Sequence, residues 1–207
     1  MEQLTLVRAL RRLEQAARLQ LPQVEQLAAS VRLVRLRERE FAFHEGDHCP
    51  RLFGVRSGLL KQFYTTPDGK EWIKSFTTED EMFACPISFE PGGRTSFGAA
   101  ALENSVLEVI DWSLIDALGE RHLAWQKAIR FAFQALTRLK MVRERDLLMY
   151  TPEQMYQQLQ ASRPDMITRV PQKELAAYLG VTPVGLNRIA RRQIHDPGKQ
   201  AWVQSVG

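Results

Sequence analysis

The chain has 207 residues, 44% of them hydrophobic, and a formal net charge of +4 at neutral pH. This hydrophobic content is ordinary for a folded protein and excludes wholesale disorder. No apolar run approaches the roughly 18 uncharged residues of a membrane helix. Two cysteines, Cys49 and Cys85, are too few for a disulfide framework or a four-thiolate metal cluster. The length favours two modest domains over a single large one.

Residues 1–29 have a helical pattern that is interrupted at Pro22. Apolar residues recur near helical spacing at Leu6, Leu10, Leu13, Ala17, Val24 and Leu27. The amphipathic start "MEQLTLVRALRRLEQAARLQLP" lacks the apolar region and the cleavage site of a signal peptide. We therefore expect a cytoplasmic protein.

From Val31 to about Asp111 the pattern changes to short β-like segments separated by turns. The segments are "VRLVRLRE", "RLFGVRSGLLKQFYTT", "EWIKSFTT" and "SVLEVID", and the turn signals are "HEGD", "RSG", "PDGK" and "EPGG". Many short strands at such spacing indicate a β-sandwich or β-barrel. The "PDGK" turn between two β-like segments predicts the tip of a hairpin.

Residues 112–149 are predicted to be helical, with a repeat of 3.5 residues that is interrupted at Asp146. The repeat consists of Ala128, Ala132, Ala135, Leu139, Val142 and Met149. This period is typical of two helices packed along a seam, so we expect the seam of a dimer, with a core helix inside one subunit as the alternative. The adjacent face, formed by Trp125, Ile129, Phe133 and Leu136, is predicted to pack on the β-rich region.

The segment 151–192 is helical with interruptions at "ASRPD" and "LGVTP". Thr151, Pro152 and Gln154 predict a capped helix start. The tail "QIHDPGKQAWVQSVG" has β-like ends around a Pro-Gly turn. From Tyr150 onward basic side chains outnumber acidic ones, which is weak support for nucleic-acid binding.

Within this segment, "RVPQKELAAYLGVTPVGLNRIARR" contains two short helices joined by a tight turn. Gly180 ends the first helix, and Thr182 caps the second. Leu175, Ala176, Leu179, Leu186 and Ile189 are predicted to face inward. The outward set is Val184, Gly185, Asn187, Arg188, Arg191 and Arg192. Such a pair of helices is a helix-turn-helix, and its Asn and Arg side chains suit base edges and phosphates.

This segment resembles the helix-turn-helix of the CRP/FNR family of bacterial transcription regulators. "FAFHEGDHCPRLFGVRSGLLKQFYTTPDGKEWIKSFTTEDEM" is similar to that family's cyclic-nucleotide-binding β-roll, and "RERDLLMYTPEQMYQQLQASRPDMITRV" is similar to its connection between the two domains. The resemblance covers nearly the whole chain.

The resemblance implies an α+β fold with an N-terminal β-roll of the double-stranded β-helix or jelly-roll type. It divides the chain into helices and β-roll (1–111), a dimerisation helix (112–149) and a winged-helix-type DNA-binding domain (150–207). The implied partners are double-stranded DNA, a second copy of the chain, RNA polymerase and an unknown small-molecule effector, with no membrane. A homodimer would hold two recognition helices about one DNA turn apart over a near-palindromic operator.

The resemblance places the DNA-binding residues at Gln172, Lys173, Thr182, Val184, Asn187, Arg188, Arg191 and Arg192. Arg188 and Asn187 are expected to contact bases, while Val184 replaces the acidic residue that is usual in the family and offers an apolar face to a thymine methyl. Because the recognition helix departs from the best-known members, its operator should also differ from theirs. The tail is short for the family's wing, so wing contacts from Lys199 are not expected.

In cyclic-nucleotide-binding members the phosphate pocket has Gly-Glu followed, after eight residues, by Arg-Ser. This chain has Ala84-Cys85 and Thr95-Ser96 at those positions, with Arg94 one residue out of register. The candidate effector pocket comprises Met82, Cys85, Arg94, Thr95 and Ser96. We expect no cyclic AMP binding and either no ligand or a different one. The alternative is a regulator that binds a cyclic nucleotide through a shifted Arg94.

"HEGDHC" offers imidazole, carboxylate and thiol groups, but it coincides with a turn of the roll, so we expect no metal and no other cofactor. Redox sensing through Cys49 or Cys85 stays open. The alternative from another class is a cupin-like metal-dependent enzyme. His122 and His195 lie outside the β-rich region, and the sequence contains no credible catalytic constellation. We therefore expect no enzyme.

Overall fold

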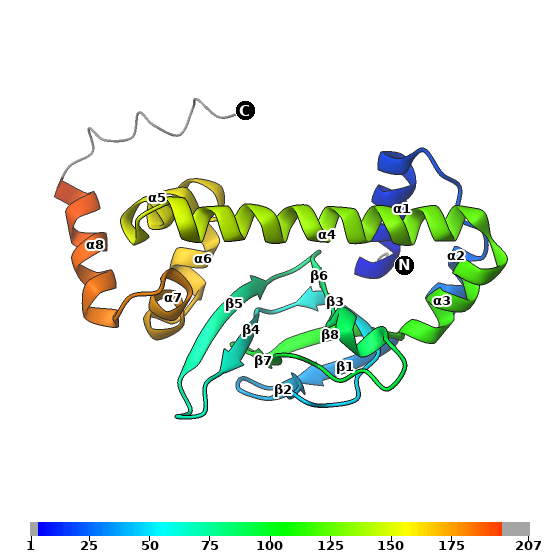
Figure 1. The fold of residues 1–207 in the computed structure, drawn as a ribbon, viewed down its shortest axis with the longest axis horizontal. Coiled ribbons are helices and arrows are strands. Elements are labelled where there is room, and N and C mark those ends of the chain that lie inside the picture. The colour runs from blue at the N-terminus through cyan, green and yellow to red at the C-terminus, as the bar shows by residue number, and fades with distance from the viewer. Residues whose placement is uncertain (1–3, 196–207) are drawn as a thin grey trace. The chain divides into compact units, whose positions relative to one another are not determined.

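The computed structural model describes residues 4–195 (Figure 1). Within this range the chain forms two compact units. The first combines the residues up to Lys70 with Lys74–Leu139, and the second combines Glu71–Ile73 with the residues from Lys140 onward. No helix in the described range is long and apolar enough to cross a membrane.

The first unit begins with two helices, α1 (Thr5–Ala17) and α2 (Val24–Ala29), which confirms the predicted helices and the break at Pro22. Gln23 precedes α2 in the left-handed region, with φ of 62°. The apolar faces of both helices are buried in one hydrophobic cluster with residues of β8, α3 and α4. Amphipathic spacing therefore produced the helices, and burial of one face holds them in place.

Residues 32–111 fold into two four-stranded antiparallel sheets, which confirms the predicted β-roll (Figure 1). One sheet has the order β1 (Arg32–Leu36), β8 (Ser105–Asp111), β3 (Arg51–Ser57) and β6 (Met82–Phe83). The other has the order β2 (Phe41–Phe43), β7 (Gly98–Ala101), β4 (Leu60–Thr65) and β5 (Glu71–Thr77). Most neighbouring strands are far apart in sequence, as in β1 and β8, whereas β4 and β5 follow each other directly.

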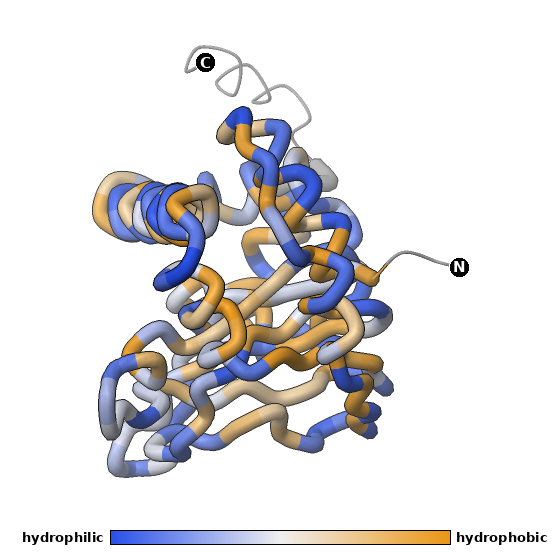
Figure 2. The backbone as a smooth tube through the Cα atoms, turned by 90° about the vertical axis from the view of Figure 1, so that its right-hand side faces the viewer, coloured by the Kyte–Doolittle hydropathy of each residue, from blue (hydrophilic) through white to orange (hydrophobic). Residues whose placement is uncertain are grey.

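The core of the roll draws residues from both sheets. Phe43, Phe53, Phe83 and Phe97 form its aromatic centre, where the rings of Phe53 and Phe83 stack with centroids 4.9 Å apart. Hydrophobic residues recur along the strands in Figure 2, which colours the backbone by hydropathy. Burial of these rings is the main stabilising term for this part of the fold.

The "PDGK" segment forms the tip of the β4–β5 hairpin, as predicted. The backbone N–H of Thr66 donates to the Lys70 carbonyl at 2.9 Å, and that of Gly69 donates to the Thr66 carbonyl at 2.8 Å. Gly69 has a φ of 80°, which only glycine adopts without strain.

A buried carboxylate fixes α1 to the roll. Glu108 on β8 is fully buried and accepts hydrogen bonds from the backbone N–H groups of Thr5 and Leu6, each at 2.9 Å. These donors lie in the first turn of α1, where no intrahelical acceptor reaches them. Glu108 thus supplies the negative charge that a helix N-terminus favours, from a strand more than 100 residues away.

Replacing Glu108 with alanine should destabilise the chain by about 1–3 kcal/mol, because two buried N–H groups would lose their acceptor. Glu108→Gln should cost less, since one amide oxygen still accepts. Urea unfolding measures both changes. Glu120→Gln, at an exposed position of α3, is the control and should change stability by less than about 0.5 kcal/mol. Equal stability of Glu108→Ala and the parent chain would contradict this role.

The predicted helical region 112–149 consists of two helices, α3 (Trp112–Arg121) and α4 (Leu123–Met149). His122 between them has an extended backbone, with φ of −132° and ψ of 116°. In the first turn of α4, the indole N–H of Trp125 donates to the Pro22 carbonyl at 2.9 Å. This contact with a residue about 100 positions earlier could not be predicted from the local pattern.

The two predicted faces of this region differ from the expectation at two positions. Trp125 and Ile129 pack in a cluster that includes Ile110 of β8 but is formed mainly by α1, α2 and α3, and Phe133, which was predicted to pack on the β-rich region, is 37% exposed. Ala128 is buried beside Trp125, so the prediction that it lines a seam with a partner is wrong. Ala128 lies three residues after Trp125 and therefore shares its buried face. The remaining members of the seam, Ala132, Ala135, Leu139, Val142 and Met149, are exposed.

The second unit contains α5 (Pro152–Ser162), α6 (Pro164–Arg169), α7 (Gln172–Leu179) and α8 (Pro183–His195). The predicted cap of α5 is confirmed: the N–H of Gln154 donates to the Thr151 hydroxyl at 3.3 Å, and the N–H of Thr151 donates to the Gln154 side-chain oxygen at 2.8 Å. Methionines, aromatic residues and leucines from the four helices fill its core, including Met155, Tyr156, Met166, Leu175, Leu179 and Leu186.

The first three residues of the predicted β-like tail are helical. Gln193, Ile194 and His195 continue α8 instead of starting an extended segment. The rest of the tail, with the Pro-Gly turn and Lys199, lies outside the described residues, as does any wing formed by it.

Candidate nucleic-acid interface

The turn between α7 and α8 has the geometry predicted from its glycine and threonine. Gly180 ends α7 in the left-handed region with φ of 72°, and the N–H of Val181 donates to the Ala176 carbonyl at 3.0 Å. The N–H of Gly185 donates to the Thr182 hydroxyl at 3.1 Å, so Thr182 caps α8. The turn thereby fixes the direction in which α8 leaves α7.

The inward faces of these two helices are apolar, as predicted. Leu175, Ala176 and Leu179 of α7 and Leu186 and Ile189 of α8 are all buried. Their burial determines the rotation of α8 about its own axis, and hence which side chains it presents to solvent.

All eight residues predicted to bind DNA are exposed, namely Gln172, Lys173, Thr182, Val184, Asn187, Arg188, Arg191 and Arg192. On α8, Val184, Asn187, Arg188 and Arg191 follow the spacing of one helical face. Val184 is 62% exposed, so its apolar side chain is accessible on this face.

The described side chains of α8 include three arginines and no acidic residue. Arg192 has the Glu153 carboxylate at 3.9 Å, an ion pair at the surface of the same unit. Arg188 and Arg191 lie closer to the face that carries Val184 and Asn187. The described part of α8 therefore presents an apolar and an amide side chain with positive charge beside them.

The candidate effector pocket lies in the connection between β6 and β7, around the short 3₁₀ helix η1 (Pro86–Phe89). Cys85 is buried, its sulfur 3.6 Å from the Ser96 hydroxyl, and the N–H of Ser96 donates to that sulfur at 3.3 Å. Gly93 passes so close to η1 that a Cβ there would lie 2.0 Å from the Ile87 carbonyl oxygen. Only glycine allows this tight fold of the loop.

Arg94 and Thr95 form hydrogen bonds with the "HEGD" turn. The Arg94 guanidinium donates to the Gly46 carbonyl at 2.9 Å. The Thr95 hydroxyl is buried, donates to the His44 carbonyl and accepts from the Asp47 N–H. The loop thus brings Cys85 and Ser96 together, places Arg94 and Thr95 on the neighbouring turn, and leaves Met82 exposed on β6.

A buried glutamine inside the roll was missed by sequence reasoning. Gln62 on β4 is 2% exposed, and its side-chain oxygen accepts from the hydroxyls of Ser75 at 2.6 Å and Thr77 at 3.2 Å. Its Nε2 atom has no hydrogen-bond partner among the described residues. Nearby, Tyr64 packs edge-on against Phe97, and burial raises the pKa of Tyr64. The signal in the sequence was a polar residue at an inward position of "LLKQFY".

The two cysteines lie in the core of the roll, linked through Ser88, whose hydroxyl is 2.8 Å from the Cys49 carbonyl and 2.7 Å from the Cys85 carbonyl. Burial raises the pKa of the Cys49 thiol, which keeps it protonated at neutral pH. Among residues 4–195, no three His, Cys, Asp or Glu side chains lie close enough to share a metal ion.

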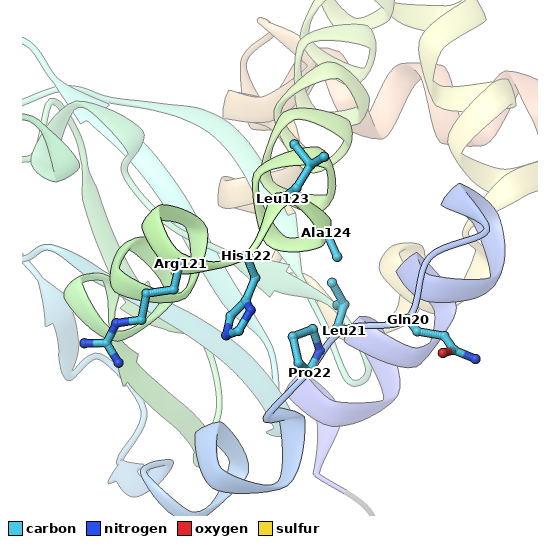
Figure 3. Close-up of a pocket in the computed structure, with 7 residues that line it drawn as sticks. All are labelled: Gln20, Leu21, Pro22, Arg121, His122, Leu123 and Ala124. Atoms are coloured by element: carbon cyan, nitrogen blue, oxygen red, sulfur yellow. The ribbon is translucent and has the colours of Figure 1, made fainter.

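A surface cavity of about 570 Å³ lies beside the junction of α3 and α4 (Figure 3). Its lining residues are Gln20, Leu21, Pro22, Arg121, His122, Leu123 and Ala124. The Nε2 atom of His122 is buried without a hydrogen-bond partner within the described range. In Figure 3 the Arg121 side chain extends away from Leu21 and Gln20, so the polar groups do not converge on one point.

Comparison with known proteins finds a family match for the β-roll and one curated relative. Residues 33–122 match the cyclic nucleotide-binding domain family. The transcriptional activator protein Anr of Pseudomonas aeruginosa is 34% identical over 86 residues, which are 42% of this chain and 34% of that protein. The matched segment thus spans about a third of this curated relative.

Solved structures extend the likeness over most of the chain. FixK2 from Bradyrhizobium japonicum superposes with a TM-score of 0.68 at 14% identity, covering 81% of this chain and 86% of that one. The c-di-GMP-responsive global regulator CLP of Xanthomonas campestris gives 0.63 at 18% identity, covering 84% and 91%. Residues 33–122 therefore match the cyclic nucleotide-binding domain family, and most of the chain has the fold of these two solved structures.

Proposed function

We propose that the chain is a homodimeric transcription regulator that binds a near-palindromic DNA site through α7 and α8. The observation that carries the proposal is the capped helix α8, which exposes Val184, Asn187, Arg188 and Arg191 on one face. Arg can bind guanine in a fork, Asn can pair with adenine, and Val can contact a thymine methyl. In this proposal α8 enters the major groove, and Gln172, Lys173 and Thr182 join Arg192 in contacting the backbone.

The exposed residues of α4 support the dimer. Leu139, Val142 and Met149 are 67%, 41% and 72% exposed, which is unfavourable for a helix in water. Asp146 would interrupt the seam, but its carboxylate pairs with Arg145 at 2.8 Å, which offsets its charge. A second copy of α4 would cover these apolar side chains and hold the two recognition helices about one DNA turn apart.

The β6–β7 loop supports independence from cyclic AMP. A cyclic phosphate needs a cation and an acceptor for the ribose hydroxyl in a sheltered place. Here Cys85 and Thr95 occupy those positions, and the Arg94 guanidinium is bonded to the Gly46 carbonyl on the neighbouring turn. We propose that the regulator acts in the cytoplasm with an empty pocket or with a different effector, and without a metal or a catalytic reaction.

Selection of bound duplexes from a random DNA pool tests this proposal, with one arm lacking and one arm containing cyclic AMP. We expect the same two-fold symmetric site in both arms. Enrichment only with cyclic AMP would show that Arg94 or another residue had taken over the phosphate. A failure to enrich any site in either arm, repeated with a cell extract that supplies small molecules, would contradict the DNA-binding proposal.

A further inference from the structure

Arg143 connects α4 with the first helix of the helix-turn-helix. Its Nη2 donates to the Tyr178 carbonyl at 2.6 Å, and its guanidinium carbon lies 3.8 Å from the centre of the Tyr178 ring. Its Nη1 lies 3.8 Å from the sulfur of Met155 on α5. One half-buried side chain of α4 therefore contacts two further helices, α5 and α7, at once.

The Tyr178 carbonyl is a suitable acceptor because it lies in the last turn of α7, where carbonyl groups lack intrahelical donors. The N–H groups of Gly180 and Val181 take the carbonyls of Ala177 and Ala176 instead. A positive charge at a helix C-terminus is also favoured by the helix dipole, and the ring of Tyr178 adds a cation–π contact. The planar guanidinium can donate to the Tyr178 carbonyl and lie against the Tyr178 ring at the same time, which a lysine ammonium cannot.

The contact is made two residues before Gly180, where the chain turns into α8. Tyr178 is therefore the point at which α4 can control the direction of the recognition helix. Arg143 itself is half-buried against α5 and α7, so it acts through Tyr178 and not as a DNA contact.

We infer that Arg143 is a positioning residue that fixes the helix-turn-helix on the last turns of α4 and so sets which half-site separation the dimer accepts. The inference rests on the proposed function, because the separation has meaning only for a DNA-bound dimer. One added base pair moves a half-site along and around the duplex, so a rigid pair of recognition helices should reject it. A loosened Arg143–Tyr178 contact should accept it.

The test uses the full chain and three duplexes that carry the selected half-sites at the selected separation, one base pair closer and one base pair farther. The variants are Arg143→Met, which keeps the apolar stem, and Arg143→Lys. Tyr178→Leu removes the ring and keeps the carbonyl. Arg130→Met is the control, since Arg130 is exposed on α4 and is not a member of the proposed seam. Thermal melting checks that each variant is folded.

We expect the parent chain to bind the duplex with the selected separation more tightly than the other two. Arg143→Met should reduce this ratio of affinities about fivefold to tenfold, and Tyr178→Leu should reduce it by less. The dependence of affinity on salt should not change, because no phosphate contact is removed. Arg130→Met should behave as the parent. A uniform loss of affinity for all three duplexes, or no change, in both Arg143→Met and Arg143→Lys would overturn the inference. Failure of the parent chain to bind any duplex would instead overturn the proposed function.

Discussion

Arg188→Ala should weaken binding to the selected operator by about 1–3 kcal/mol and relax the preference at one base pair of each half-site. Arg188 is exposed on α8, directly after Asn187 and four residues after Val184. The side chain is long enough to reach guanine O6 and N7, and alanine leaves both acceptors unpaired. Titrations with duplexes that carry each of the four bases at that position measure the effect.

Arg192→Ala provides the contrasting result. Arg192 is 70% exposed and lies near Glu153, so we propose that it neutralises a phosphate and reads no base. Its loss should weaken binding to all sequences alike and lower the slope of log affinity against log salt by about one.

A charge-matched control separates these local effects from the loss of one positive charge. Arg39→Ala removes a 90% exposed arginine beside Glu38 on the roll and should leave both affinity and specificity unchanged. If Arg188→Ala and Arg192→Ala also leave DNA affinity unchanged, α8 is not the recognition helix.

Features set by neighbouring residues were predictable from the sequence. Four local features each follow from the preferences of a few adjacent residues. They are the break at Pro22, the hairpin tip at Gly69, the capping box at Thr151 and the turn at Gly180. The inward and outward faces of α8 followed from its period. The motif at 169–192 was enough to suggest a family resemblance and to predict the exposed residues of the candidate interface.

Features set by residues distant in sequence were not predictable. The carboxylate of Glu108 caps α1 from β8, and the indole of Trp125 reaches Pro22, which helps to explain why Ala128 is buried instead of lining a seam. Arg143 donates a hydrogen bond to the carbonyl of Tyr178, which lies 35 residues later in the sequence. In each case the partner is determined by how the elements pack, and no local pattern encodes the pairing.

The second large effect concerns α4. Leu139→Asp together with Val142→Asp should convert the dimer into a monomer, raising the dimer dissociation constant by at least about a hundredfold. Burying each of these side chains is worth about 1.5–3 kcal/mol, and two-fold symmetry removes each contribution twice. Four carboxylates would also be brought together in an apolar interface. Sedimentation equilibrium measures the change directly.

The affinity for the operator should fall when the dimer is lost, because binding of one half-site no longer brings a second recognition helix close to the other half-site. The weak binding of a single half-site by a monomer should persist. Thr137→Asp is the matched control: it places the same side chain at an exposed position of α4 that lies about opposite the seam in the heptad repeat. A dimeric double variant with full operator affinity would contradict the seam at Leu139 and Val142. A monomeric parent chain that still binds the palindromic site tightly would contradict the dimer itself.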